Sequence, residues 1–185
     1  SDVTKDYGKL NQDWWQKPWQ VTDSNAIVTV NIETPILPTT CYRWFYQSNN
    51  LEEIKNMQNL CMDECVSTHA MFLQCYKLKK VDTKNWNTSK NTNMGGMFQS
   101  CSELAEVDVS KWDTSNVTDM TAMFYSCPKI KELDVSNWDT GKVQSFDRMF
   151  MSAGFLSKTD IDVSDWDTSS CKNMQSMFQW SGVRK

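Results

Sequence analysis

The chain has 185 residues, of which 39% are hydrophobic and 12% aromatic, so it can bury one core and is not disordered. Its formal net charge is -4 and its pI is near 5.0, which argues against a nucleic-acid partner, because phosphate binding needs a concentrated basic face. Apolar runs such as residues 26–30 are too short to cross a bilayer, so we expect no transmembrane segment.

Residues 1–40 precede a repeat and are predicted to form an N-terminal cap. Trp14, Trp15 and Trp19 supply apolar surface that could close one end of a repeat array. Residues 26–32 alternate β-branched side chains, which predicts a strand. A sugar-stacking aromatic patch is the alternative interpretation of the tryptophans.

Residues 41–185 carry the repeat, which recurs about every 26 residues and forms one folded unit with the cap. A Met-Phe pair ends at Phe72, Phe98, Phe124, Phe150 and Phe178, and the tryptophans at positions 86, 112, 138 and 166 keep the same spacing. Fixed periods of this length indicate a solenoid of stacked coils.

Each repeat predicts a strand followed by a helix. Leu104, Val107 and Val109 have the L-x-x-L-x-L spacing of a leucine-rich repeat, and residues 130–135 repeat it. Apolar side chains then recur three or four apart over residues 117–127, behind a potential N-cap at Asn116 and an acid at position 119. The predicted fold is an α/β leucine-rich-repeat solenoid, with a parallel sheet on one face, short helices on the other and an N-terminal cap.

The last full repeat holds two extra residues in the segment MSAGFLSKTD. We place this insertion in the turn after the predicted helix, where Gly154 permits a sharp backbone bend.

The seven cysteines mostly occupy apolar positions of the repeat, which predicts reduced, buried thiols. Cys75, Cys101 and Cys127 share one position, whereas Cys61 falls in a turn and is the candidate exposed thiol. A zinc site formed by Cys61, Cys65 and the single histidine, His69, is a weaker alternative, because a fourth ligand is missing.

Two further positions of the repeat have structural interpretations. The tryptophans are predicted to pack inward, with the indole N–H bonding neighbouring backbone, and a carbohydrate platform is the alternative. The Asp-Thr pairs that begin at Asp113 and Asp139 predict Asx-type turns.

Asp82, Asp108, Asp134 and Asp162 recur once per repeat, at a strand position that should face outward. They are our candidate ligand face. The row is interpreted either as a solvated acidic surface with local hydrogen bonds or as a binding face for a basic partner or divalent cation. A glycosidase would need one carboxyl group with a raised pKa, and a uniform row supplies no such asymmetry.

The segment LDVSNWDT, followed by Met-Phe-x-x-Cys in other repeats, resembles the BspA-like leucine-rich repeats of bacterial surface proteins over residues 41–185. The resemblance implies an extracellular or cell-surface protein in mature form, without its leader. It also implies noncatalytic recognition or adhesion, with no catalytic residue, cofactor or metal. The expected partner is a host or bacterial surface protein or a glycan. The alternatives are a structural spacer that presents other modules and, more remotely, a glycan hydrolase.

Overall fold

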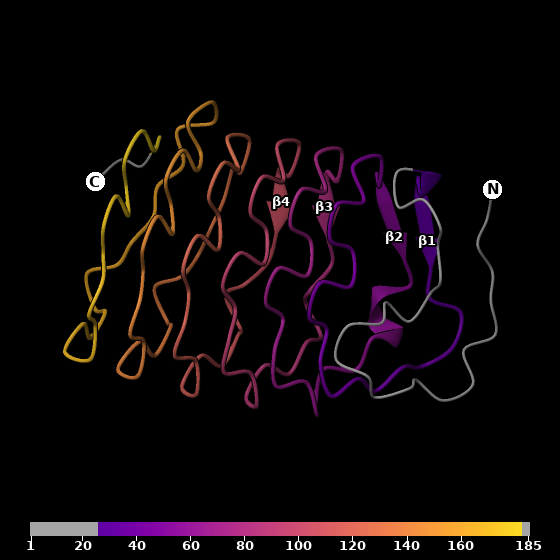
Figure 1. The fold of residues 1–185 in the computed structure, drawn as a ribbon, viewed down its shortest axis with the longest axis horizontal. Coiled ribbons are helices and arrows are strands. Elements are labelled where there is room, and N and C mark those ends of the chain that lie inside the picture. The colour runs from indigo at the N-terminus through magenta and orange to yellow at the C-terminus, as the bar shows by residue number, and fades with distance from the viewer. Residues whose placement is uncertain (1–25, 183–185) are drawn as a thin grey trace.

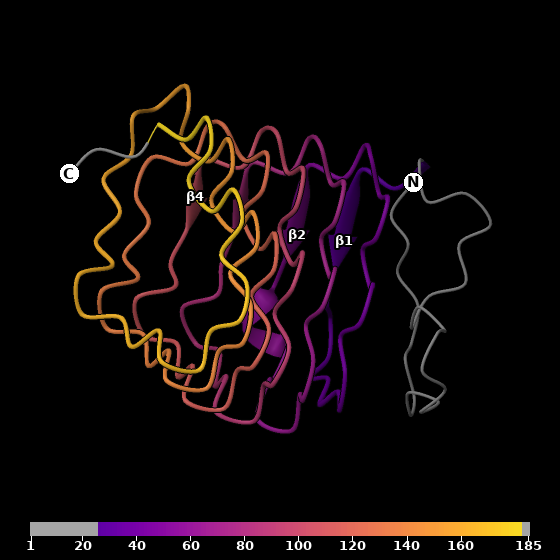
Figure 2. The same ribbon diagram turned by 60° about the vertical axis from the view of Figure 1, so that its left-hand side comes forward.

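The computed structural model describes residues 26–182. Over this range the chain winds into successive coils that lie side by side, from β1 at one end to the C-terminal segment at the other (Figure 1, Figure 2). Parallel bridges join Ser67 to Asn93, Asn93 to Asp119 and Asp119 to Ser145. Equivalent residues of adjacent coils are therefore neighbours in space, in the register that the sequence period predicts.

The regular strands are few and short. β1 (Thr29–Asn31) pairs in parallel with β2 (Glu53–Lys55), and β3 (Lys80–Val81) pairs in parallel with β4 (Glu106–Val107). A 3-10 turn, η2 (Met57–Asn59), follows β2. β1 confirms the strand predicted within residues 26–32, and β4 lies in the segment predicted from Leu104. Residues 130–135 form no strand.

The predicted α/β leucine-rich-repeat solenoid is wrong. Residues 26–182 contain no α-helix, and their strands form two separate two-stranded sheets rather than one continuous parallel sheet. Residues 121–126, at the centre of one predicted helix, form turns instead. Equivalent turns recur in the other coils, so each coil has a short strand or extended segment on one side and a run of turns on the other.

The backbone of these turns is incompatible with a helix. Ala122 and Ser126 have φ values of 54° and 56°, in the left-handed region, whereas an α-helix needs φ near −63°. Successive N–H groups alternate between two kinds of partner. Phe98 N–H donates to the carbonyl of Met123 in the next coil at 2.9 Å, and Cys101 N–H donates to Phe98 within its own coil at 3.1 Å.

The spacing of the coils explains why no helix forms on this side. Stacked rings of the phenylalanine column have centroids 5.1 Å apart between Phe45 and Phe72, 5.4 Å apart between Phe72 and Phe98, and 5.5 Å apart between Phe98 and Phe124. Packed helices need about 8–10 Å between their axes. A column at this spacing therefore accommodates extended or turn backbone and excludes one helix per coil.

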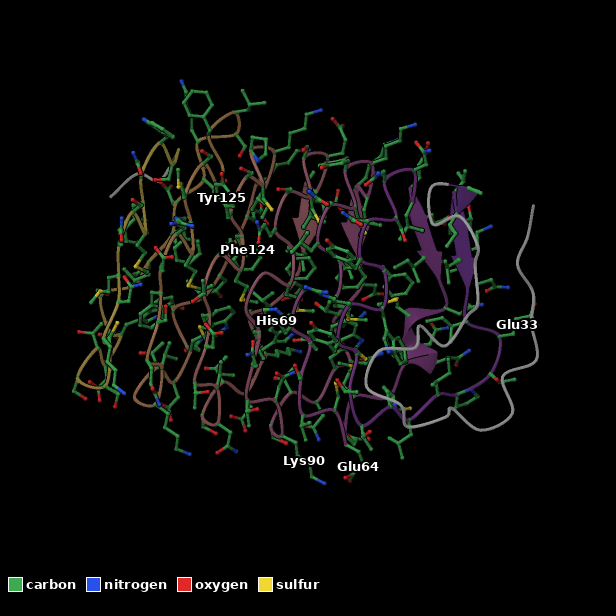
Figure 3. The ribbon with its side chains drawn as sticks, viewed as in Figure 1. Glu33, Glu64, His69, Lys90, Phe124 and Tyr125 are labelled. Atoms are coloured by element: carbon green, nitrogen blue, oxygen red, sulfur yellow. The ribbon has the colours of Figure 1, made fainter. Side chains whose placement is uncertain are left out.

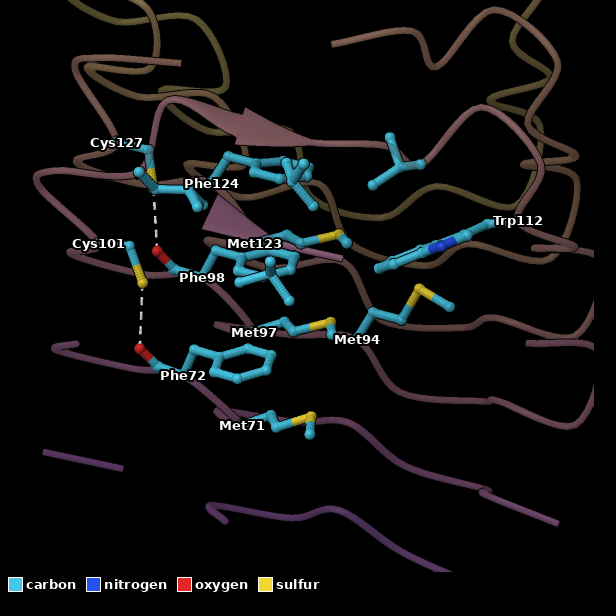
Figure 4. Close-up of a cluster of buried hydrophobic side chains, with 14 of the residues drawn as sticks. Met71, Phe72, Met94, Met97, Phe98, Cys101, Trp112, Met123, Phe124 and Cys127 are labelled. Atoms are coloured by element: carbon cyan, nitrogen blue, oxygen red, sulfur yellow. Dashed lines mark hydrogen bonds between the residues drawn. The ribbon is translucent and has the colours of Figure 1, made fainter. Parts of the chain in front are cut away.

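Columns of identical side chains fill the core (Figure 4). Phe72, Phe98 and Phe124 are fully buried, and their neighbouring methionines form a second column. The thiols of Cys101 and Cys127 donate to the carbonyls of Phe72 and Phe98, at 3.1 and 2.9 Å. The thiol column thus links each coil to its neighbour.

The cysteine predictions are confirmed except at Cys171, which is partly exposed although it shares the apolar repeat position of Val117. All seven cysteines are free, and five of them are buried, namely Cys41, Cys65, Cys75, Cys101 and Cys127. Cys61 is partly exposed, as its turn position indicated.

The tryptophan column also packs inward as predicted. Trp112 and Trp138 stack with ring centroids 6.2 Å apart, and both side chains are buried. The indole N–H groups of Trp138 and Trp166 donate to backbone carbonyls of the preceding coil at 3.0 Å. The indole nitrogens of Trp86 and Trp112 are buried without a hydrogen-bond partner, so the predicted bond forms in only part of the column.

Gly154 lies in the predicted insertion and has a φ of 57°. A Cβ there would lie 2.8 Å from the side chain of Thr159, so both the backbone angle and the packing require glycine. The insertion itself carries two exposed apolar side chains, Phe155 and Leu156. Trp14, Trp15 and Trp19, predicted to belong to the cap, lie outside the described residues.

Candidate functional site

The four predicted carboxylates all lie on the strand side of the coils. Asp82 directly follows β3 and Asp108 directly follows β4, while Asp134 and Asp162 take the equivalent place in later coils. All four side chains are exposed. The alternation of a short strand explains this placement, because Val107 and Val109 on either side of Asp108 are buried in the core.

Each carboxylate is held by the turn that follows it. Oδ1 of Asp108 accepts hydrogen bonds from the N–H of Ser110 at 3.1 Å and from its hydroxyl at 2.7 Å. Asp134 is held in the same way by Ser136, at 3.2 and 2.7 Å. The equivalent N–H donors are Lys84 for Asp82 (3.3 Å) and Ser164 for Asp162 (3.0 Å).

These bonds favour the charged form of the carboxyl groups. The hydroxyl and then the N–H of Ser110 lower the pKa of Asp108 below its ordinary value. The N–H and then the hydroxyl of Ser164 lower the pKa of Asp162. Across residues 26–182, no group donates to Oδ2 of either carboxylate. Each therefore remains ionised at neutral pH with one oxygen available.

An open groove of about 680 Å³ brings three of the predicted residues together, and Asp162 does not line it. The groove lies over β3, β4 and the segment of the next coil. Its charged lining consists of three lysines (Lys80, Lys84 and Lys131) and five carboxylates (Asp82, Glu106, Asp108, Glu132 and Asp134). The groove thus has mixed charge with a net of two negative charges.

The lysines were missed by reasoning from the sequence. Lys80 Nζ lies 2.9 Å from the carboxylate of Glu106 in the next coil, and both side chains are exposed. This contact lowers the pKa of Glu106. A second hollow of about 530 Å³ shares Lys80 and Asp82 and extends over β1 and β2. The sequence did contain a signal for this ion pair. In the aligned repeats, Lys80 occupies the position that Glu106 and Glu132 occupy in the following coils.

The predicted Asx-type turns, which directly follow the tryptophans in the sequence, are confirmed. Asp113 Oδ1 accepts from the N–H of Ser115 at 3.0 Å, and Asp139 Oδ1 accepts from Gly141 at 3.1 Å. The buried hydroxyl of the following residue, Thr114, donates to the carbonyl of Asp139 in the next coil at 2.8 Å. This threonine ladder, which also stitches the coils together, was not predicted.

Two alternatives raised by the sequence fail. Within the part of the chain that the structure describes, no group of three or more His, Cys, Asp or Glu side chains could hold a metal ion, so Cys61, Cys65 and His69 form no zinc site. A carbohydrate platform needs exposed indole faces, but Trp86, Trp112 and Trp138 are buried.

No helix within residues 26–182 is long and apolar enough to cross a membrane. No curated protein and no solved structure matches the chain. A family model described as "Mycoplasma protein of unknown function, DUF285" matches residues 39–159 and 66–183. These overlapping matches cover most of the sequence and agree with the predicted bacterial relationship, although they do not name the BspA-like repeats. The chain therefore belongs to the DUF285 family.

Proposed function

We propose that this chain is a noncatalytic recognition module of a bacterial surface protein and binds its partner through the groove beside β3 and β4. The observation that supports this most directly is the groove itself, where Asp82, Asp108 and Asp134 lie beside three lysines. Charged groups of both signs on one face favour selection of a partner with complementary charges. The resemblance to BspA-like surface proteins supports the extracellular or cell-surface location.

The groove favours a host or bacterial surface protein, or a glycan, as the partner. Ionised carboxylates such as Asp108 attract basic side chains and accept hydrogen bonds from sugar hydroxyls. The turn formed with Ser110 orients the carboxylate in advance, which reduces the ordering cost on binding. The net negative charge biases the groove toward partners with basic groups.

The competing proposals have less support. A spacer needs only the regular stack of coils and gives no reason for a mixed-charge groove on one side. A glycan hydrolase needs a general acid with a raised pKa, whereas the pKa values of Asp108 and Asp162 are lowered. We therefore propose recognition without catalysis.

An array of glycans and of host and bacterial surface proteins tests the proposal. The chain carrying Asp108→Asn and Asp134→Asn is compared with the wild-type chain. Asparagine keeps the Oδ1 acceptor of each turn, so the fold should be retained while two groove charges are removed. We expect at least a tenfold loss of binding to the partner that the wild-type chain selects, in line with the loss of hydrogen bonds to charged groups.

The matched control carries Asp113→Asn and Asp139→Asn. These residues form the same type of turn and are equally exposed, but they do not line the groove. The control changes the net charge by the same amount and should bind like the wild-type chain. Equal binding by all three proteins would refute a role for the groove, and absence of any partner on the array would favour the spacer.

A further inference from the structure

The single histidine has an unsatisfied nitrogen in the run of turns on the side opposite the groove. Nδ1 of His69 is buried and has no hydrogen-bond partner. The imidazole ring is stacked on Tyr42 of the preceding coil, with centroids 5.5 Å apart and planes 11° apart. Figure 3 shows His69 within the stack of coils. An orphaned buried polar atom calls for a partner such as an ion or water.

The neighbouring coil has a glycine at the equivalent position. Three polar atoms converge on the point that a Cβ of Gly95 would occupy: Asp119 Oδ2 at 3.1 Å, His69 Nδ1 at 3.1 Å and Asn93 Oδ1 at 3.2 Å. The next coil places Thr121 at this position. The missing side chain of Gly95 therefore lets these three polar atoms approach one another closely, and we call the place where they meet the notch.

Local hydrogen bonds fix the atoms that surround the notch. Asn93 Oδ1 accepts from the N–H of Gly95 at 2.9 Å, and the amide of Asn93 donates to Asp119 Oδ2 at 3.3 Å. Asp119 Oδ1 accepts from the N–H of Thr121 at 2.9 Å. An imidazole nitrogen that carries no proton is an electron-pair donor, as are the carboxylate and amide oxygens. Such a set suits a cation.

We propose that His69, Asn93 and Asp119 form a binding site for a divalent transition-metal ion of the zinc class. Imidazole nitrogen and carboxylate oxygen are ordinary zinc ligands, and an amide oxygen can complete a three-donor set. An ion would lie beyond that Cβ point, clear of the Gly95 backbone, and the three donors would close on it to metal–ligand distances of about 2.0–2.2 Å. The site has one imidazole and one carboxylate and uses none of the cysteines.

The single histidine makes the proposal directly measurable. Zn²⁺ is titrated into the reduced, ¹⁵N-labelled chain while the two imidazole nitrogens are followed by NMR. We expect the Nδ1 resonance to move more than Nε2 and to saturate at one ion per chain. No movement at millimolar Zn²⁺ would refute the site. Zinc uptake that leaves the imidazole unchanged would also refute it, because the ion would then be held by thiols or other groups.

Three variants test the donors and the notch. His69→Gln replaces the imidazole and Asp119→Asn replaces the charged carboxylate by a neutral amide, a weaker ligand, and each should weaken Zn²⁺ binding by at least about tenfold. Gly95→Ala keeps all three donors but places a methyl group where they converge. Gly95 has no positive φ, and Thr121 shows that the fold accepts a side chain at the equivalent position, so this variant should fold and lose the ion.

Asp147→Asn is the matched control. Asp147 lies at the same position of the repeat as His69 and Gly95, and its replacement removes one negative charge from the same side without touching the notch. Zn²⁺ affinity should stay within about twofold of wild type. Unchanged affinity in Gly95→Ala and Asp119→Asn, with far-UV circular dichroism like that of wild type, would overturn the proposal.

Discussion

The two sides of each coil hold their neighbours in different ways. On the strand side, β3 and β4 pair at only two positions, Lys80 with Glu106 and Val81 with Val107. On the turn side, the N–H groups of alternate residues all donate to the next coil: Gly96 to Thr121 at 2.7 Å, Phe98 to Met123 at 2.9 Å and Ser100 to Tyr125 at 2.7 Å. Stacking is therefore enforced mainly by the turn side.

The side chains show the same division. Phenylalanine recurs in the turn column at positions 72, 98 and 124, whereas the strand column changes from Lys80 to Glu106. A ring in the interior must match the ring above and below it, but an exposed charge can change without cost to packing. The strand side is thus free to vary its charge, which fits the recognition role proposed for its groove.

The largest expected effect comes from shortening one side chain on each side of the same coil. Phe98 is fully buried between two stacked rings, while Val107 on β4 is 7% exposed. Phe98→Ala should lower the free energy of unfolding by about 3–5 kcal/mol, and Val107→Ala by about 2 kcal/mol. Urea unfolding followed by tryptophan fluorescence measures both.

The comparison requires that both variants unfold with the wild-type dependence on urea, so that only stability has changed. An equal loss in the two variants would contradict the conclusion that the turn side dominates stacking. A larger loss in Val107→Ala would reverse it.

The periodicity of the sequence predicted the columns and mispredicted the backbone between them. The spacing of Val117, Met120 and Met123 fits one face of a helix, but consecutive turns also bring every third residue inward. Hydrophobic spacing indicates which side chains are buried, but it does not indicate which carbonyl groups accept hydrogen bonds from the backbone N–H groups. The left-handed residues Ala122 and Ser126 gave no warning, because neither is a glycine.

The candidate site was predictable in part for the same reason. A two-residue alternation placed Asp108 and Asp134 outside the core, and the repeat aligned them. The groove depends also on Lys131. The residue type at that position differs from coil to coil, so alignment of the repeats did not single it out. The convergence of His69 and Asp119 could not be predicted, because it depends on the register of three coils and on the absence of a side chain at Gly95.

A smaller effect is expected from alkaline pH, acting on the turn side. Burial raises the pKa of the Cys127 thiol from 9.0 to about 12. Because the folded pKa is raised, the neutral thiol stabilises the fold fully below pH 9. That contribution is lost as pH rises toward 12, at about 1.4 kcal/mol per pH unit.

Urea unfolding of the reduced chain at pH 8, 9 and 10 measures this loss, with Cys127→Ala as the reference. The other ionisable groups are present in both proteins, so their contributions cancel in the difference. The wild-type chain should lose its advantage over the variant by about 1.4 kcal/mol at pH 10. Parallel pH profiles would show that the thiol reaches water in the folded chain.

The smallest expected effect isolates the backbone of the turn side from its side chains. Gly96 and Ala122 occupy the same position in adjacent coils, with φ values of 61° and 54°. Gly96→Ala adds a methyl group whose nearest contact is the flexible side chain of Gln99 at 3.2 Å, so its cost should be the left-handed penalty of about 1 kcal/mol. Ala122→Gly relieves that penalty and adds a similar freedom to the unfolded chain, so its stability should stay within about 0.5 kcal/mol of wild type. Thermal unfolding by circular dichroism resolves both changes. If Gly96→Ala were neutral, the stacked coils would impose the left-handed backbone without a conformational cost, and the stability of the turn side would reside in its side-chain columns alone.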